Sequence, residues 1–351
     1  MANATQDLQH RRPTLRDVAE AAGTSVKTVS RVVNNEGGVS PGLLKRVTHA
    51  IELLGYRPHH AAAALRSTST STRTIGFVQV DVGNPFFAAV FRGIEDVAHD
   101  KSVRVLTASS DADNRRQNET IAAFISRRVD GLIVIPVGTD LDLLETEVTK
   151  HGTPVVFLDL MPPKLIGDVV LSDHFGGAFT ATRHLLDHGH TRVGFLCHAD
   201  PAFYHSAGER LRGYTQGLEQ AGIELDPSLV IQGVDTPALG ATATRRLMSL
   251  PEPPTAVFAS HNYSAIGLVQ AIHDLGLEQR VATISFADID LADVVEPGLT
   301  VIVQDPRDLG RVAGEMLFRR LNGFTGPPEV VVRDVALVHR GSGEISYQER
   351  M

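Results

Sequence analysis

The sequence predicts two kinds of structure in one chain: an all-α helix-turn-helix head, and an α/β body made of two doubly wound, parallel-sheet lobes. Three observations lead to this prediction. Residues 14–66 carry three short helical patterns separated by glycine turns. From residue 74 onward, short apolar runs alternate with helical patterns, which favours parallel strands joined by right-handed crossovers. Charge is also segregated, because residues 1–66 carry a net charge of +4 and the remainder carries −12.

The first helix of the head has a clear start and a clear stop. Thr14 and Asp17 form a capping-box pattern, which predicts a helix that begins at Leu15. Gly23 is expected to end it, since glycine enters the left-handed conformation without a steric penalty. Val18, Ala19 and Ala22 then share one apolar face.

The second helix presents a basic, hydroxylated face. Ser25 is its predicted N-cap, and the helix runs from Val26 to about Asn34 with three valines on the apolar side. No carboxylate occurs in this stretch, and two cations alternate with hydroxyls and an amide. Such a face suits phosphates and base edges in a DNA groove, although a three-helix bundle that binds nothing is the plain alternative.

The third helix is predicted over 43–54. Ser40 and Pro41 read as its N-cap and first helical residue, and Gly55 closes it. Four apolar residues are expected to cover the first two helices: Leu44, Val47, Ile51 and Leu54.

Three strings in this region, TLRDVAEAAGTSVKTVSRVVN, VSPGLLKRV and LGYRPHHAAAAL, resemble the lactose-repressor family of bacterial transcription regulators in order, spacing and residue type. The resemblance implies that the partner is palindromic operator DNA. It assigns base reading to Val26, Lys27 and Arg31. It assigns contacts with the DNA backbone to Ser25, Thr28, Ser30, Asn34, Ser40 and Tyr56.

The alanine-rich segment 59–66 resembles the hinge helix of that family, which forms only on operator DNA and enters the minor groove. His59, Ala62 and Leu65 are the hinge residues implied, with Leu65 as the wedge that opens the central base step. About eight residues are too few for a stable isolated helix, so folding on DNA is consistent with the composition. An ordinary linker helix is the alternative for these alanines.

We expect a DNA-binding domain over 13–58, a hinge helix and linker over 59–73, and an effector-binding and dimerisation domain over 74–345. The polar, low-complexity residues 67–73 read as the linker. The resemblance extends over the whole body and implies a fold like that of periplasmic binding proteins, in which the chain crosses between lobes three times. The first lobe would comprise about 74–171 and 305–332, and the second about 172–303 and 333–345.

The strands expected in the body are nine short apolar runs: 74–80, 103–109, 131–137, 154–160, 169–173, 192–197, 229–233, 256–260 and 282–286. Helices are expected between them, among others over 86–102, 114–128, 175–189, 207–222 and 264–276. No apolar run reaches membrane-spanning length, and the N-terminus lacks the apolar core of a signal peptide. The lone Cys197 excludes an intrachain disulfide. Together these features predict a soluble, cytoplasmic protein, associated with the nucleoid when bound to its operator.

Ligands of doubly wound folds bind at the carboxyl ends of strands, here in the cleft between lobes. The candidate effector-binding residues are Asn84, Phe86, Phe87, Asp159, Asp173, Arg210, His261 and Gln304. The two phenylalanines follow the first strand, where they either sandwich a sugar ring or only pack on the sheet. The aspartates, Arg210 and Gln304 match family positions that hold the ligand or lie at the lobe crossings.

Three positions depart from the pattern of family members that bind simple sugars. Leu160 stands where an arginine often follows the strand-end aspartate, His261-Asn262 replaces Asn-Asp, and Ala287 replaces an aspartate. Each lost hydrogen bond leaves a partner unpaired, which costs about 1–3 kcal/mol. We therefore expect a sugar or sugar-like metabolite other than a simple pentose or hexose. It would be an anionic or larger glycoside-like compound, held in part by His174, Tyr204, His205 and His261.

Several other classes of function are disfavoured. The histidines of HLLDHGHTR, at 184, 188 and 190, resemble metal spacing, but the string matches a structural turn of the family, so we expect no metal and no cofactor. The sequence holds no nucleophile elbow, Walker pattern or dinucleotide-binding glycine pattern, so we expect no enzymatic activity. The C-terminal residues carry no leucine heptad, which favours a homodimer over a tetramer. The remaining alternative is a cytoplasmic solute-binding protein without a regulatory role.

Overall fold

The computed structural model describes residues 13–33, 37–57, 71–138, 140–198 and 205–347, and the chain divides into two compact units, Met1–Thr72 and Arg73–Met351. The first unit contains the head. The second is the body. Among the described residues, no helix combines the length and the apolar character needed to span a bilayer.

The head is built from α1 (Leu15–Ala21), α2 (Val26–Val33) and α3 (Pro41–Leu54). The capping box is confirmed, because the Asp17 backbone N–H donates to the Thr14 hydroxyl and the Thr14 backbone N–H donates to the Asp17 carboxylate. Gly23 and Gly55 both adopt left-handed conformations, with φ of 60° and 59°, and end α1 and α3. The core of the head is made of Val18, Ala19, Ala22, Val29, Val47, Ala50 and Tyr56.

One residue expected in that core is not there. The Leu44 side chain is 46% exposed, whereas Leu43, one residue earlier and a third of a helical turn away, packs against the core. The apolar face of α3 therefore runs through Leu43, Val47 and Ala50. Ser40 is the N-cap of α3 as predicted, but its hydroxyl makes no capping hydrogen bond.

The sheet of the first lobe contains six strands in the order β11-β5-β4-β3-β1-β2, and every pairing is parallel. The strands are β1 (Thr74–Gln79), β2 (Arg104–Ser109), β3 (Leu132–Val134), β4 (Val155–Leu158), β5 (Asp168–Ser172) and β11 (Val330–Arg333). The inner strands β3, β4 and β5 are buried along their whole length, which explains their near-continuous apolar sequence.

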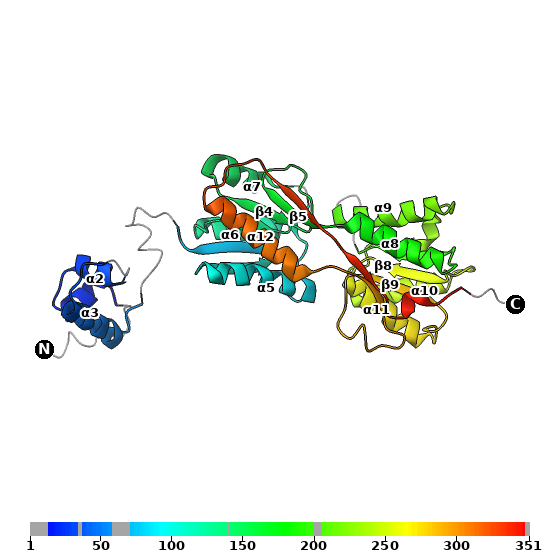
Figure 1. The fold of residues 1–351 in the computed structure, drawn as a ribbon, viewed down its shortest axis with the longest axis horizontal. Coiled ribbons are helices and arrows are strands. Elements are labelled where there is room, and N and C mark those ends of the chain that lie inside the picture. The colour runs from blue at the N-terminus through cyan, green and yellow to red at the C-terminus, as the bar shows by residue number, and fades with distance from the viewer. Residues whose placement is uncertain (1–12, 34–36, 58–70, 139, 199–204, 348–351) are drawn as a thin grey trace. The chain divides into compact units, whose positions relative to one another are not determined.

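Helices cover both faces of this sheet (Figure 1). On one face lie α5 (Pro85–Asp100) and α12 (Pro306–Leu321), which contact each other and the residues of one apolar core. On the other lie α6 (Asn114–Ser126) and α7 (Asp142–Thr146), the latter continued by the π-helical turn η2 (Glu147–His151).

The second lobe repeats this design with the strand order β12-β10-β9-β8-β6-β7. Its strands are β6 (Val193–Leu196), β7 (Val230–Ile231), β8 (Ala256–Ala259), β9 (Ala282–Phe286), β10 (Thr300–Val303) and β12 (Ala336–Val338), of which only β12 pairs antiparallel. One face is covered by α8 (His174–Asp187) and α9 (His205–Gln220), the other by α10 (Pro237–Met248) and α11 (Asn262–Asp274). Two 3-10 turns complete the lobe, η3 (Pro227–Leu229) and η4 (Ser342–Glu344).

The chain passes between the lobes three times, from β5 to α8, from β10 to α12, and from β11 to β12 (Figure 1). In each sheet the strand order reverses beside the first strand of the lobe, β1 or β6. This reversal separates the loops on either side and leaves a crevice at the carboxyl ends of the strands. The predicted fold class is therefore confirmed, and it places the candidate site where the two lobes face each other.

Candidate functional site

A cavity of about 440 Å³ lies between the lobes and draws its walls from both. Its residues follow the carboxyl ends of strands or begin the helices after them, as the doubly wound topology requires. Those with polar side chains are Asp81, Asn84, Asp159, His198, Ser206, Arg210, Asp235, Thr236, His261, Asn262, Tyr263 and Gln304. The volume falls in the range of small-molecule sites.

Arg210 in α9 is the buried cation of the cavity. Its guanidinium donates to the carbonyl of Ser260 and to His174 Nδ1 at 3.2 Å, and it lies 3.9 Å from the centre of the Phe286 ring. Burial lowers its pKa to about 10, so it remains charged at neutral pH. Arg210 Nε has no hydrogen-bond partner among the described residues. A bound molecule can supply the missing acceptor.

Asp159 is the buried anion of the cavity and follows β4 directly. Its backbone is left-handed, with φ of 64°, a conformation that aspartate adopts more readily than most residues. Burial raises its pKa, but the nearby His174 side chain and the charge of Arg210 outweigh that effect and leave the pKa below its usual value. Asp159 Oδ1 has no hydrogen-bond partner among the described residues. His174 Nε2 is 3.5 Å away, too far for a good hydrogen bond.

Two stacked histidines form the wall contributed by the second lobe. The rings of His198 and His261 lie 5.1 Å apart at 22°. Burial, followed by the charge of Arg210, lowers the pKa of His261 to about 3 and holds that of His198 well below 6.5. Both rings are therefore neutral. His198 is bonded to Ser260 at 3.1 Å, whereas His261 Nδ1 has no partner among the described residues.

Direct hydrogen bonds between residues that line the cavity join the two lobes. Asn262 Nδ2 donates to Asn84 Oδ1 at 2.8 Å, and Asn84 Nδ2 donates back at 3.3 Å. The Tyr263 hydroxyl donates to Asp81 Oδ2 at 3.2 Å. At the lobe crossings, Gln304 Nε2 donates to the Ser172 hydroxyl at 2.7 Å. These hydrogen bonds hold residues of the two lobes together directly.

Phe86 and Phe87 both line the cavity, in the first turn of α5. Their rings meet edge to face, with centroids 5.3 Å apart at 80°. Phe87 also belongs to the apolar core of the first lobe, and Phe86 packs against that core. The two interpretations of this pair are thus compatible, because the same rings support the sheet and form an apolar wall.

The exposed face of α2 carries the side chains expected to read DNA. Val26, Lys27, Arg31 and Ser25 are exposed, while Thr28 and Ser30 are half-buried and Val29 is fully buried underneath. The Ser25 and Thr28 hydroxyls lie 3.0 Å apart, and the Thr28 backbone N–H donates to Ser25 Oγ.

Of the other positions assigned to DNA contact, Ser40 is exposed, whereas Tyr56 is 9% exposed and packs in the core of the head. The predictions for Asn34, His59, Ala62 and Leu65 fall outside the described residues, as do those for Tyr204 and for the hinge as a whole.

Comparison with known proteins identifies the family. The model of bacterial regulatory proteins of the lacI family matches residues 14–59, and that of the periplasmic binding protein-like domain matches residues 182–343. The HTH-type transcriptional repressor PurR of Photobacterium profundum is 30% identical over 330 residues, covering 91% of this chain and 97% of that protein. The ribose operon repressor of Escherichia coli is 31% identical over 331 residues, covering 94% and 99%.

The chain belongs to the LacI family of bacterial regulatory proteins.

A solved structure supports the same conclusion for the whole chain. The lac repressor dimer bound to operator and the anti-inducer ONPF has a TM-score of 0.82 at 26% identity, covering 95% of this chain and 99% of that one. This LacI-family chain is accordingly a DNA-binding transcription repressor with a helix-turn-helix head and an effector domain. The alternative of a solute-binding protein without a regulatory role is not supported.

Seven of the eight effector-site residues expected for this LacI-family member line the cavity. Asp173 does not, because its carboxylate caps α8 by accepting the Gly176 backbone N–H at 2.8 Å. His174 lies behind the cavity wall, bonded to Asp159 and Arg210, and His205 at the start of α9 is also outside the lining.

Sequence reasoning missed several lining residues: Asp81, His198, Ser206, Asp235, Thr236 and Tyr263. Asp81 and His198 lie two residues beyond the last residues of β1 and β6, and Asp235 follows β7. A polar residue shortly after the end of a strand was thus the sequence signal for a lining residue. The strand order decides which of these residues lie together in the cavity.

Proposed function

We propose that this repressor binds a neutral, hydroxyl-rich sugar or sugar-like metabolite in the interlobe cavity, and that binding alters its affinity for a palindromic operator. The observation that carries the proposal is the set of unmatched polar atoms at one place. Arg210 Nε, His261 Nδ1 and Asp159 Oδ1 are buried in the cavity wall and have no hydrogen-bond partner in the part of the chain that the structure describes. Each unmatched group destabilises the ligand-free protein, so a ligand that satisfies all three is favoured.

The charges of the wall favour a neutral ligand. Arg210 is charged and Asp159 is ionised, and their charges stabilise each other, while His198 and His261 are neutral. An anion would therefore meet one cation already compensated by a carboxylate. A hydroxyl donates to one group and accepts from another, so a diol suits this set of donors and acceptors. Of the two ligand classes suggested by the sequence, an anionic compound and a larger glycoside-like one, this argument favours a neutral glycoside.

The apolar part of the cavity suits the carbon face of a sugar ring. Phe86 and Phe87 present an edge-to-face aromatic pair, and Leu160 and Ala287 replace polar residues with small or apolar ones. Most ligand pockets combine such apolar walls with few polar groups that fix orientation. The proposed effector-binding residues are Asn84, Phe86, Phe87, Asp159, Arg210, His198, His261, Asn262 and Gln304.

On the DNA side, we assign base reading to Val26, Lys27 and Arg31, and backbone contacts to Ser25, Thr28, Ser30 and Ser40, which are exposed or half-buried. The division into head, hinge and body, the homodimer and the cytoplasmic location belong to the same proposal. The first sheet strand follows the linker immediately, so a lobe movement reaches the head through β1. The change in operator affinity that a ligand can cause is limited by the difference between its affinities for the two lobe arrangements.

The decisive experiment is a thermal-shift screen of the full-length protein against pentoses, hexoses, glycosides, polyols and sugar phosphates. A ligand at 100 times its dissociation constant stabilises by about 2.7 kcal/mol, which raises Tm by a few degrees. The Arg210→Ala variant should lose the shift and the effector response while it keeps operator binding.

Arg212→Ala is the matched control, because Arg212 lies on the same helix, is 61% exposed at its side chain and pairs with Glu209. It should respond as the wild type does. A hit among sugar phosphates but not among neutral glycosides would contradict the charge argument. Retained response in Arg210→Ala would contradict the site.

A further inference from the structure

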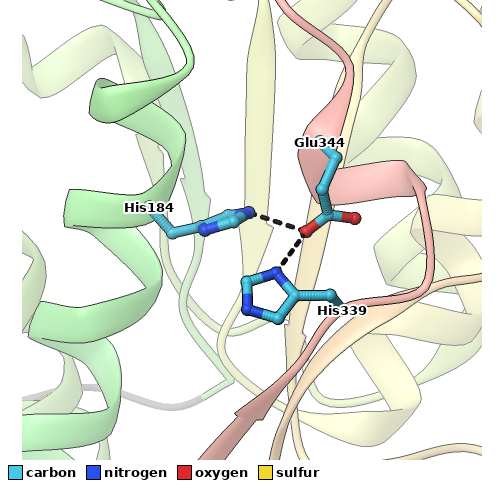
Figure 2. A group of neighbouring side chains, drawn as sticks. All are labelled: His184, His339 and Glu344. Carbon is cyan, nitrogen blue, oxygen red and sulfur yellow. Dashed lines mark hydrogen bonds and ion pairs between the residues drawn. The ribbon is translucent and has the colours of Figure 1, made fainter.

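A second cluster of polar side chains lies in the second lobe, outside the interlobe cavity. His184 in the last turn of α8 and His339 just after β12 both face Glu344 of η4 (Figure 2). Glu344 Oε1 is 2.7 Å from His184 Nε2 and 2.9 Å from His339 Nδ1. One atom from each of the three residues lies within 4.8 Å of the others, and this is the one such group among the described residues.

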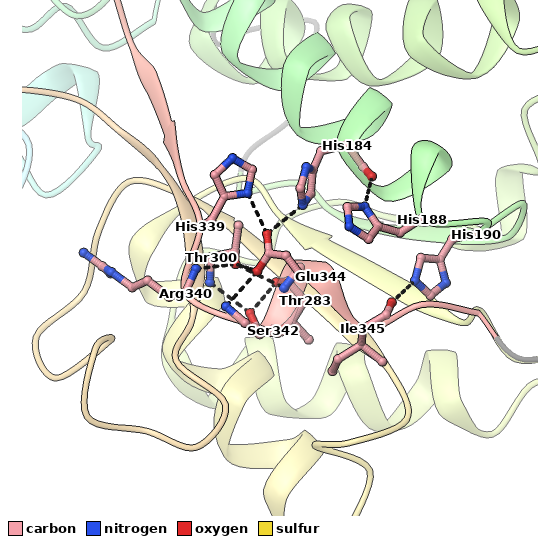
Figure 3. Close-up of polar contacts among 12 residues, drawn as sticks. His184, His188, His190, Thr283, Thr300, His339, Arg340, Ser342, Glu344 and Ile345 are labelled. Carbon is pink, nitrogen blue, oxygen red and sulfur yellow. Dashed lines mark hydrogen bonds and ion pairs between the residues drawn. The ribbon is translucent and has the colours of Figure 1, made fainter.

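The carboxylate is held in position by groups behind it. Glu344 Oε2 accepts from the Thr300 hydroxyl at 2.8 Å and from the Gly341 backbone N–H at 2.7 Å, which leaves Oε1 turned toward the imidazoles (Figure 3). Ser342 ties the same turn to the sheet, since its hydroxyl donates to the Thr283 carbonyl at 2.7 Å. Supporting hydrogen bonds of this kind orient the ligands of metal sites and limit their rotation.

The donor types suit a transition metal. His184 Nε2 and His339 Nδ1 are imidazole nitrogens, and Glu344 Oε1 is a carboxylate oxygen. The cluster therefore combines one carboxylate with two imidazoles.

We propose that His184, His339 and Glu344 bind one divalent transition-metal ion of the zinc type. Two nitrogens and one oxygen are typical zinc ligands, whereas Ca²⁺ and Mg²⁺ take sets of oxygens. Ligand atoms around a tetrahedral zinc ion stand about 3.3 Å apart for bonds of 2.0–2.1 Å. Zinc binding would therefore lengthen the two nitrogen–oxygen contacts from 2.7 and 2.9 Å and set the two nitrogens, which lie within 4.8 Å of each other, at the same spacing. The His339 side chain is 59% exposed, so water has access to a remaining coordination position.

The neighbouring histidines do not join this set. His188 Nδ1 donates to the His184 carbonyl at 2.8 Å, and His190 is bonded to the Thr255 hydroxyl and the Ile345 carbonyl. They are the structural turn expected from sequence. His184 differs because its partners lie 155 and 160 residues further along the chain, and the HLLDHGHTR spacing alone does not reveal them. A bound ion would cross-link α8 to the segment that follows the last lobe crossing.

The test uses untagged full-length protein, stripped with a chelator and dialysed against limiting Zn²⁺, with bound metal measured by elemental analysis. One zinc ion per chain is expected. Zinc at 100 times its dissociation constant should shift the unfolding equilibrium about 100-fold. The His339→Ala variant should lose at least tenfold in zinc affinity. Because the His339 side chain is exposed, the variant should still fold as the wild type does. The visible spectrum of bound Co²⁺ should disappear in the same variant.

The chain has 15 histidines, and any of them could bind zinc adventitiously. Variants that each remove one histidine outside the proposed site control for such binding. His151→Ala removes an exposed histidine from the first lobe, and His188→Ala removes the ring beside His184. Both variants should keep one zinc ion at wild-type affinity. The proposal is overturned if wild-type protein retains no zinc, if His339→Ala binds as wild type does, or if His151→Ala loses binding equally.

Discussion

Two histidines in the cavity wall, His198 and His261, stay uncharged at a pH where histidine ordinarily becomes charged. Burial, followed by the charge of Arg210, lowers the pKa of His261 to about 3, and burial also holds that of His198 well below 6.5. Both side chains titrate near 6.5 once the chain unfolds. Below that pH the unfolded state therefore binds more protons than the folded state, and the free energy of unfolding falls as the pH decreases.

The first prediction follows from this difference. From pH 7 to pH 5, His261 should remove about 2 kcal/mol from the free energy of unfolding, at about 1.4 kcal/mol per pH unit below 6.5, and His198 should act in the same direction. Urea unfolding of wild type and His261→Gln measures this directly, and the variant should show the flatter dependence. His273→Gln, an exposed histidine on the same helix, should keep the wild-type slope. Equal slopes in all three proteins would contradict the prediction.

The sequence predicted the location of a single residue well where that residue type has one usual role at its position in the fold. Arg210 and Asp159 were expected in the cavity and line it. Asp173 shows the limit, because an aspartate before a helix serves equally as an N-cap or as a ligand-binding carboxylate, and here it caps α8. Leu44 shows a second limit. Where two leucines are adjacent, the sequence does not tell which of them lies on the buried face of the helix, and here Leu44 is the exposed one.

Among the elements, pairs of helices cross at glycines and leave no room for a side chain. A Cβ atom on Gly310 of α12 would stand 2.0 Å from the Val90 carbonyl oxygen of α5, and one on Gly93 would stand 2.0 Å from that of Arg307. The α10–α11 pair has the same design at Gly240 and Gly267. Since backbone atoms form these contacts, an added methyl group can be accommodated only by moving a helix.

The second prediction concerns this crossing. Gly310→Ala should destabilise the body by about 3 kcal/mol, because α12 must move away from α5. Gly314→Ala is the matched control one turn further along α12, where the nearest atoms to the added one belong to the Val97 side chain, at 3.2 Å and beyond, and not to a backbone. It should change stability by less than about 1 kcal/mol, helped by the better helix propensity of alanine. Chemical denaturation of both variants checks this, and similar losses would refute the backbone argument.

Strand prediction found nine of the twelve described strands and missed the last three in the chain, β10, β11 and β12. Interior strands such as β4 and β8 are buried on both faces, so their apolar runs are nearly continuous. The edge strands β11 and β12 are exposed or half-buried, and neither was among the expected strands. The largely buried β10 was missed as well. The place of β11 and β12 depends on a pairing partner from a distant segment, β5 for one and β10 for the other, and local sequence does not encode that partner.

For the whole molecule, charge is divided between two units with different partners. The segment that contains the head carries +4 and the rest of the chain −12. DNA is a polyanion, so the body is repelled from it while the head is attracted. A single small head supplies few phosphate contacts, and two heads on one dimer are needed for high affinity at physiological salt.

The third prediction tests this division. Selection from random DNA with full-length protein should yield sites with two inverted half-sites, as two-fold symmetry requires. Scrambling one half-site should weaken binding at least about 100-fold, whereas scrambling the flanks should not, because specific contacts exceed non-specific ones by several kcal/mol. Electrophoretic mobility shifts at matched salt measure both. Selected sites without dyad symmetry would argue against a homodimer.

The matching strand orders of the two lobes also have an evolutionary meaning. Asp159 after β4 and Ala287 after β9 occupy corresponding positions, and both backbones are left-handed, with φ of 64° and 77°. Alanine gains nothing from that conformation, whereas aspartate and asparagine tolerate it well. The second lobe thus keeps a backbone already shaped for an acidic side chain. A single codon change at Ala287 could return a carboxylate to the cavity, so ligand choice can diverge among descendants without rebuilding the fold.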